Sequence, residues 1–153
     1  NAKPGLNMKR TNDYTLKVEE LAKATEWTEK TIEKLRDIRS QEPTWENMRG
    51  VKYYSAIATG YVEIPEDGVY YISSDNEEVW IDGKLLVNNG GEVKRFSRKD
   101  SSAALAKGKH EIKVVFLSHI IGGWPSAWND GSVKLRKADA EKFTPIKAEQ
   151  LFH

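Results

Sequence analysis

The stretch from Gly60 to Val87 constrains the fold most, because short apolar runs alternate there with tight polar turns. Val62 and Ile64 alternate with polar residues, a pattern typical of a half-buried strand. The pair Asp82-Gly83 then separates two runs in which every second residue is apolar: Val79, Ile81, Leu85 and Val87. Both central residues of a type I′ turn need positive φ, which Asp-Gly tolerates well. The stretch therefore predicts an antiparallel hairpin.

The rest of the chain predicts further strands and one polar loop. Ile112 to Leu117 is mostly apolar and β-branched, as in a central strand buried on both faces. Ser132 to Arg136 predicts a strand that closes a sheet, and Arg98 to Ser102 predicts a polar loop. Gly122 to Gly131 is too rich in Gly, Pro and Asn to predict regular structure. The expected fold is all-β, a two-sheet antiparallel β-sandwich.

The N-terminal third is ambiguous between helix and strand. Leu6 and Met8 predict an edge strand that pairs with the C-terminal part of the sheet. Apolar residues between 16 and 39 fall near helical spacing, and Glu, Lys and Ala dominate. Gln41-Glu42-Pro43 ends this segment, since the residue before proline avoids the α region. One short helix fits in this third, while helix and strand both stay open for residues 18–39.

Length and net charge limit the class of protein to which this chain can belong. A chain of 153 residues predicts a single domain, residues 1–153. The 24 basic and 23 acidic residues leave a net charge of +1, so no bulk field favours nucleic acid as a partner. The sequence has no run of about 20 apolar residues that would predict a membrane span. Cysteine is absent, which excludes disulfides and thiol catalysis, and the start without Met suggests a fragment of a longer chain.

Several motifs in order resemble one known family. They are Pro65-Glu66-Asp67-Gly68-Val69-Tyr70, Ser74-Asp75, Val79-Trp80-Ile81-Asp82-Gly83-Lys84, Leu105 to Ile112, and Thr144 to Phe152. This set resembles the lectin-like β-sandwich named after the fourteen-kilodalton part of anthrax protective antigen, with the core of the resemblance over 56–152. It implies a strand in 25–32, with Trp27 packed on the sandwich.

A second, narrower resemblance comes from the two ends of the chain. Lys3-Pro4-Gly5-Leu6 and Glu149-Gln150-Leu151-Phe152-His153 resemble the C-terminal module of Bacteroides-type β-N-acetylhexosaminidases. This implies a glycosidase as the parent chain, with its catalytic acid pair in another domain of the same chain. It also implies a periplasmic or extracellular, cell-surface location.

The first candidate site is Ser74-Asp75-Asn76, followed by Glu77 and Glu78. In the resembled family, adhesins bind calcium through two consecutive aspartates joined by a cis peptide bond, and the calcium holds a sugar. Asn76 stands where the second aspartate would be, and a non-proline cis bond costs about 3–4 kcal/mol. The sequence therefore predicts no tightly bound calcium and a trans bond between Asp75 and Asn76. The alternative to a sugar site is a turn in which Asp75 accepts backbone N–H bonds.

The second candidate site is the loop containing Trp124 and Trp128, followed by Asn129 and Asp130. An exposed indole stacks on the apolar face of a pyranose while nearby amides and carboxylates bind its hydroxyls. Alternatively, the tryptophans belong to the core. The carbohydrate-binding set predicted from sequence is thus Trp124, Trp128, Asn129, Asp130, Asp75 and Asn76.

Catalysis by this chain is not predicted. His110, His119 and His153 are too far apart for a helical zinc motif, and neither G-x-S-x-G nor a P-loop occurs. The expected function is a non-catalytic carbohydrate-binding or accessory module of a bacterial glycoside hydrolase, without a cofactor. Its expected partners are a glycan, including N-acetylhexosamine, and the catalytic domain of its own chain. The alternative is a structural spacer that packs between domains and binds no ligand.

Overall fold

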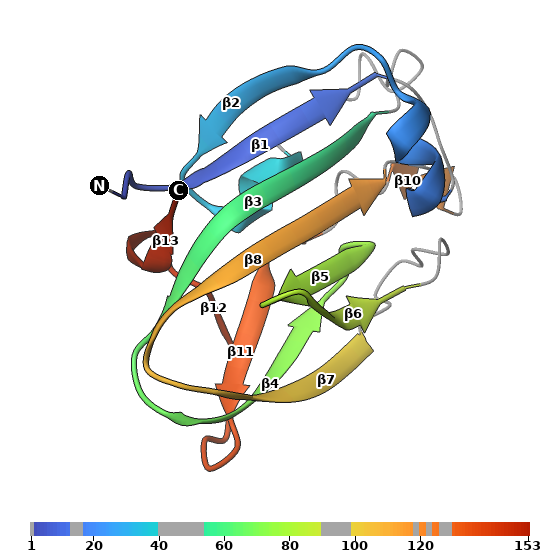
Figure 1. The fold of residues 1–153 in the computed structure, drawn as a ribbon. Coiled ribbons are helices and arrows are strands. Elements are labelled where there is room, and N and C mark those ends of the chain that lie inside the picture. Colours follow the sequence, from blue (N-terminus) through green and yellow to red (C-terminus); the bar gives the residue numbers. More distant parts are fainter. Residues whose placement is uncertain are drawn as a thin grey trace.

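The computed structural model describes residues 2–12, 17–39, 54–89, 99–117, 120–121, 124–125 and 130–153, and these form two antiparallel sheets (Figure 1). The larger sheet has the order β2-β1-β3-β8-β5-β6, with β13 paired to β3. The smaller has the order β12-β11-β4-β7. The all-β, two-sheet antiparallel sandwich expected from the sequence is confirmed.

The bounds of the elements are as follows. The larger sheet contains β1 (Leu6–Thr11), β2 (Thr28–Ile32), β3 (Ser55–Ile64), β5 (Glu78–Ile81), β6 (Lys84–Asn88), β8 (Gly108–Leu117) and β13 (Leu151–Phe152). The smaller contains β4 (Gly68–Ser74), β7 (Lys99–Leu105), β11 (Val133–Lys137) and β12 (Thr144–Pro145). The pair β9 (Ile120–Ile121) and β10 (Trp124–Pro125) stands apart, and η1 (Val18–Lys23), η2 (Leu35–Arg39) and η5 (Ala148–Gln150) are 3-10 helices.

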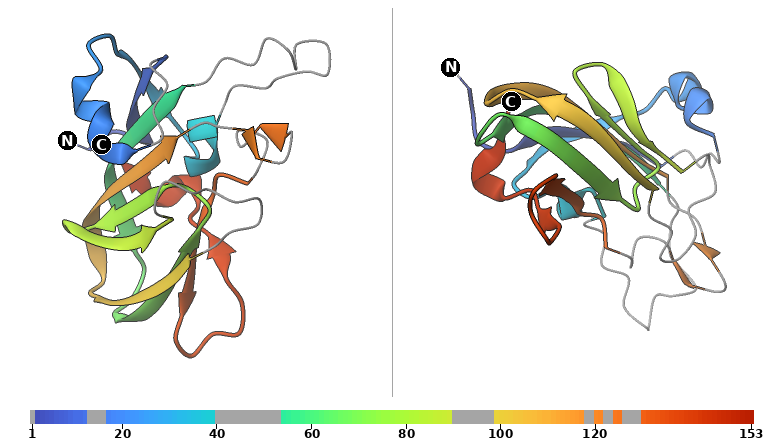
Figure 2. Two further views of the ribbon diagram at one scale, coloured as in Figure 1. Left: turned by 90° about the vertical axis from the view of Figure 1, so that its right-hand side faces the viewer. Right: turned by 90° about the horizontal axis from the view of Figure 1, so that it is seen from below.

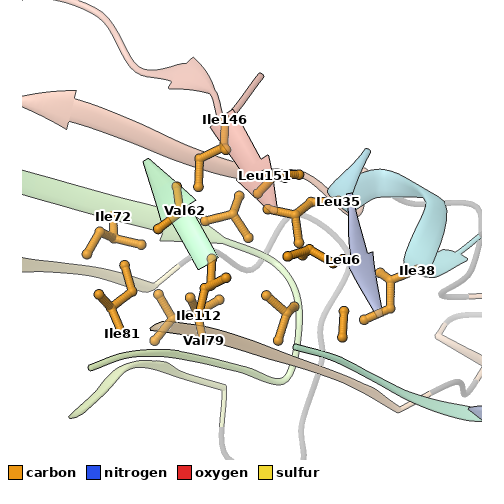
Figure 3. Packing of buried hydrophobic residues seen from close by; sticks show 14 of the residues in the cluster. Leu6, Leu35, Ile38, Val62, Ile72, Val79, Ile81, Ile112, Ile146 and Leu151 are labelled. Carbon is orange, nitrogen blue, oxygen red and sulfur yellow. The ribbon is translucent and has the colours of Figure 1, made fainter. Parts of the chain in front are cut away.

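One hydrophobic core joins the inner faces of both sheets (Figure 3). Val62 and Ile112 come from the larger sheet, and Ile72 and Leu135 come from the smaller. The long pair β3–β8 runs from Ser55 opposite Leu117 to Ile64 opposite Gly108, and the last four residues of β8 are all buried. The central strand expected over Ile112 to Leu117 is therefore confirmed, but its burial on both faces is limited to residues 114–117, since Lys113 is exposed.

The hairpin at Asp82-Gly83 forms as expected, but one of its side chains does not lie where the sequence pattern placed it. Asp82 has φ 51° and Gly83 has φ 76°, which suits a type I′ turn. Val79 pairs with Val87, whereas Trp80 pairs with Leu85, so β6 carries one extra residue at a bulge. The bulge reverses the alternation, and Leu85 is therefore 37% exposed instead of buried.

The described part of the N-terminal third contains two strands, β1 and β2, and two short helices, η1 and η2. β1 lies between β2 and β3, so the expectation that Leu6 and Met8 form an edge strand is wrong, and β2 takes the edge. Thr28–Ile32 is the strand that the family resemblance implied. Residues 18–39, for which helix and strand were both open, contain η1, β2 and η2. Each of the two short helices contributes only a few buried side chains to the sandwich.

Two loop predictions are also wrong within the described residues. Lys99–Leu105 pairs with β4 along its whole length, from Gly68 opposite Leu105 to Ser74 opposite Lys99. A polar sequence can form this strand because β7 is the edge of the smaller sheet and makes backbone bonds on one side. Trp124–Pro125 pairs with β9 inside the Gly-rich stretch. No helix in the described part of the chain is long and apolar enough to cross a membrane.

Residues 3–5 and 151–153 hold the two ends of the chain together. Lys3 and His153 exchange backbone hydrogen bonds of 2.8 Å in both directions, and Gly5 N–H donates to the Leu151 carbonyl at 2.9 Å. Pro4 and Phe152 form an antiparallel bridge between these bonds. The ends consequently lie side by side in both views of Figure 2.

Candidate functional site

The turn between β4 and β5 is polar in sequence and buried in the structure. Asp75, Asn76 and Glu77 are 5%, 0% and 1% exposed. Buried polar side chains are costly unless the protein itself supplies their hydrogen bonds. The partners of this turn therefore decide what it can do.

Arg39, the last residue of η2, supplies the charge that Asp75 needs. One guanidinium nitrogen lies 3.1 Å from Asp75 Oδ1, donates to the Asp75 carbonyl at 2.9 Å and donates to Asn76 Oδ1 at 3.1 Å. The other donates to Asp75 Oδ2 at 3.3 Å. The guanidinium also lies over the Phe116 ring, 4.5 Å from its centroid. Burial lowers the pKa of Arg39, while the nearby Asp75 opposes that change.

Asn76 joins the first candidate site to the residue that directly follows the second one in sequence. Its Nδ2 donates to the Gly131 carbonyl at 2.8 Å and to Ser74 Oγ at 3.0 Å. Ser74 Oγ in turn donates to the Ser132 carbonyl at 3.1 Å. The turn after β4 and the segment before β11 therefore meet at one end of the sandwich.

Among the members of the predicted set whose side chains are described, Asp130 is exposed, whereas Asp75 and Asn76 are buried. Its Oδ1 accepts a hydrogen bond from Ser132 N–H at 3.0 Å, and its Oδ2 lies 3.4 Å from Lys134 Nζ. Partial burial pushes the pKa of Asp130 upward, but the bonds from Ser132 and the charge of Lys134 outweigh this, so the pKa is lowered. Asp130 is an ionised, exposed carboxylate held in a fixed orientation.

The remaining predicted residues divide into two groups. Asp75 and Asn76 face Arg39 and Gly131 inside the protein, and the Asp75 carboxylate lies against the Arg39 guanidinium. Trp128 and Asn129 lie outside the described residues, as does the side chain of Trp124, whose backbone belongs to β10. Arg39 was missed by sequence reasoning, because a single arginine far along the chain gives no local signal that it is buried.

The residues of this turn do not fit a divalent cation. The Asp75 carboxylate already lies against a guanidinium, whose positive charge repels a second cation at the same oxygens. The peptide bond between Asp75 and Asn76 is trans, as the sequence predicts. The described ranges also contain no group of three or more His, Asp and Glu side chains placed to hold a metal ion. Arg39 provides the positive charge of this turn.

His110, near the start of β8, makes a second polar cluster on another part of the surface. Its Nδ1 lies 2.6 Å from Asp82 Oδ2, and its Nε2 lies 2.6 Å from the Ala106 carbonyl. Asp82 Oδ1 also accepts a hydrogen bond from Glu111 N–H at 3.0 Å. The histidine thus fastens the β5–β6 hairpin to the start of β8.

Comparison with known proteins gives similarity at the levels of sequence and fold. A β-hexosaminidase of Porphyromonas gingivalis is 41% identical over 150 residues, which are 98% of this chain and 19% of that enzyme. An anti-sigma factor domain-containing protein has a similar fold, with a TM-score of 0.70 and 18% identity over 97% of this chain and 47% of the other.

The A domain of epithelial adhesin 6 from Candida glabrata, solved in complex with Galb1-3GlcNAc, is also similar in fold. Its TM-score is 0.62, with 13% identity over 99% of this chain and 88% of the adhesin chain. The model of the PA14 domain matches residues 3–147. Because that match spans nearly the whole chain, this protein belongs to the PA14 domain family.

Proposed function

We propose that this chain is a non-catalytic, glycan-binding accessory module of a larger glycoside hydrolase that removes terminal N-acetylhexosamine. The observation that carries the proposal is the hydrogen bond from Asn76 to Gly131, because it joins the polar turn after β4 to the residue next to Asp130 at one end of the sandwich. The identity with a β-hexosaminidase over 19% of that enzyme's length supports the choice of parent chain.

At this end of the sandwich, the buried residues would position the backbone, and the exposed residues would contact the sugar. Arg39, Asp75 and Asn76 are buried and fix the backbone around Gly131. Asp130 is exposed and would accept hydrogen bonds from sugar hydroxyls. The indoles of Trp124 and Trp128, with the Asn129 amide, are the sequence-based candidates for stacking and further hydrogen bonds. A module with this role would work in the periplasm or at the cell surface, where the glycans are.

Titration of the chain with N-acetylglucosamine and its oligosaccharides tests the proposal. A shallow, open site gains about 4–5.5 kcal/mol, so we expect dissociation constants of about 0.1–1 mM. Trp124→Ala, Trp128→Ala and Asp130→Asn should weaken binding. Glu141→Gln is the matched control, since it is exposed beyond the opposite end of β11. Circular dichroism of each variant separates loss of binding from loss of fold.

The outcomes of this titration are distinct. Unchanged binding by all three variants contradicts the end of the sandwich as the site, and unfolding of both tryptophan variants contradicts the stacking role. A chain that binds none of the sugars is a spacer, the alternative that the sequence leaves open. Hydrolysis of an aryl N-acetylglucosaminide that disappears when a carboxylate of this chain is changed contradicts the non-catalytic assignment.

A further inference from the structure

The outer face of the larger sheet, turned away from the core, is covered by described residues over only part of its area. Leu21 and Val18 of η1, together with Trp27, pack on Val115 and Leu117 at one end of β8 and on Ile57 of the neighbouring strand. The other half of β8 on this face carries Glu111 and Lys113, both exposed. Figure 1 shows η1 at one end of the sheet and β3, β8 and β5 running beside one another away from it.

A groove of about 430 Å³ lies on this uncovered half, in the range of small-ligand sites. Its lining includes Thr59 and Tyr61 of β3, Glu111 and Lys113 of β8, and Trp80 of β5. Tyr61 is 41% exposed and Trp80 is half-buried. Within the described residues, three large apolar side chains are strongly exposed, and two of them, Tyr61 and Leu85, are on or beside this groove.

The strand register fixes how the two aromatic rings are spaced. Tyr61 pairs with Glu111, and Trp80 pairs with Lys113, so the rings stand on strands either side of β8 and two residues apart along it. With strands about 4.8 Å apart and a rise of about 3.4 Å per residue, the two positions are roughly 12 Å apart. This separation is longer than a single pyranose ring, so a ligand touching both aromatics would need at least two sugar units.

The polar groups between the rings favour a neutral ligand. Glu111 and Lys113 have opposite charges, and Thr59, which pairs with Lys113, adds a hydroxyl. Hydroxyl-rich ligands both donate and accept, which such a set can satisfy, whereas an anion or a cation would meet one group of its own sign. The Trp80 ring is also preorganised: its Nε1–H donates to Glu78 Oε1 at 2.9 Å, and Lys113 Nζ lies 5.4 Å from its centroid.

We propose that this groove is a second carbohydrate-binding site, which takes a neutral oligosaccharide of two or more pyranose units across Tyr61 and Trp80. The choice of a carbohydrate as the ligand of this groove rests on the function proposed above. It uses a different surface, because Arg39, Asp75, Asn76 and Asp130 are not among the residues that line the groove. Two separate weak sites on one module would raise the residence time on a polysaccharide by avidity.

Amide and indole N–H chemical shifts of the chain, followed during titration with N-acetylglucosamine, chitotriose, cellotriose and maltotriose, test the groove. We expect shifts at Tyr61, Lys113 and the Trp80 Nε1–H, with at least one trisaccharide binding more tightly than the monosaccharide. Tyr61→Ala should reduce groove affinity about three- to tenfold, while Tyr61→Phe, which keeps the ring, should reduce it less. Val69→Ala is the matched control: it removes an exposed apolar side chain from β4 of the other sheet.

Each pattern of shifts has one interpretation. Shifts confined to residues near Asp130 and Gly131 overturn the groove and leave the proposed function standing. Shifts confined to the groove support the second site and contradict the site at the end of the sandwich. No shift in the groove with any of the three trisaccharides, or an equal loss of affinity in Tyr61→Ala and Val69→Ala, overturns the groove proposal.

Discussion

Arg39 and Asp75 form a buried ion pair in which one guanidinium contacts both carboxylate oxygens and the backbone carbonyl of the same aspartate. Two charges of this kind are costly to remove from water singly, so each side chain is tolerated in the interior because the other is present. The pair also fixes the turn from which Asn76 reaches Gly131. Stability and the shape of the candidate site thus depend on the same two residues.

Replacing Arg39 with methionine should lower the free energy of unfolding by about 3–5 kcal/mol, because Asp75 then stays buried without the guanidinium charge that offsets its own. Urea denaturation followed by circular dichroism measures this change. Arg36→Met is the matched control: Arg36 is exposed on the same helix, and its loss should cost no more than about 0.5 kcal/mol. Similar losses of unfolding free energy in the two variants would mean that the ion pair makes no specific contribution to stability.

Calcium should not stabilise the chain, since Arg39 holds the Asp75 oxygens that a calcium ion would need. We expect the same melting temperature in excess calcium and in excess chelator, and no calorimetric signal on titration with calcium. Asn76→Asp is a second variant to titrate with calcium, because it adds a carboxylate beside the Arg39 guanidinium and gives two consecutive aspartates. A rise in melting temperature with calcium in the unmodified chain would contradict this prediction.

Stability should fall as the pH rises through the titration of His110. Partial burial alone lowers the pKa of His110, but hydrogen bonds to Asp82 and Ala106 outweigh it and raise the pKa above its ordinary value. Both ring nitrogens face acceptors, and only the protonated imidazole donates to both. A folded pKa above the unfolded value of about 6.5 gives stability that is complete below that pH and is lost above it.

The measurement for His110 is the free energy of unfolding between about pH 5.5 and pH 8.5, a window that brackets the unfolded pKa. Asp82→Asn is the control, because asparagine also tolerates the positive φ of position 82 while removing the charge. The decline with pH should be smaller in that variant. Equal declines in both proteins would show that another group is responsible.

Gly131→Ala should destabilise the chain through contact with Arg39 and not through backbone strain. A Cβ at position 131 would lie 2.9 Å from Arg39 Cδ and 3.1 Å from its Cγ, and the bonds to Asp75 and Asn76 prevent the arginine from moving aside. In an Arg39→Ala background the same change should cost much less. A double-mutant cycle by urea denaturation checks this, and additive effects would contradict the steric explanation.

Local chemistry in the sequence predicted those features that depend on neighbouring residues. Asp82-Gly83 forms its hairpin because the requirement for positive φ is met within two residues. The exposed position of Leu85 could not be predicted in this way, since the bulge that turns it outward depends on pairing with β5. Arg98 to Ser102 was predicted as a loop, although Lys99–Leu105 forms β7, because an edge strand needs little apolar sequence.

The candidate site was the least predictable part, because its central contact joins residues 36 positions apart. Asp75 and Asn76 in sequence are as typical of an exposed turn as of a buried one, and their burial follows from Arg39. The open half of the outer face of the larger sheet could not be predicted from the sequence either. Its existence depends on how far η1 reaches over β8, which no local pattern indicates.

The paired backbone bonds between Lys3 and His153 also determine how the domain responds to tension. The two segments are antiparallel, so a force that pulls residues 3 and 153 apart loads their hydrogen bonds one pair at a time, like a zipper, instead of shearing them together. We expect this end to open at low force in a single-molecule pulling experiment, while the long β3–β8 pair beyond it still holds. The domain would thus yield where residues 3–5 and 151–153 pair before its sandwich unfolds.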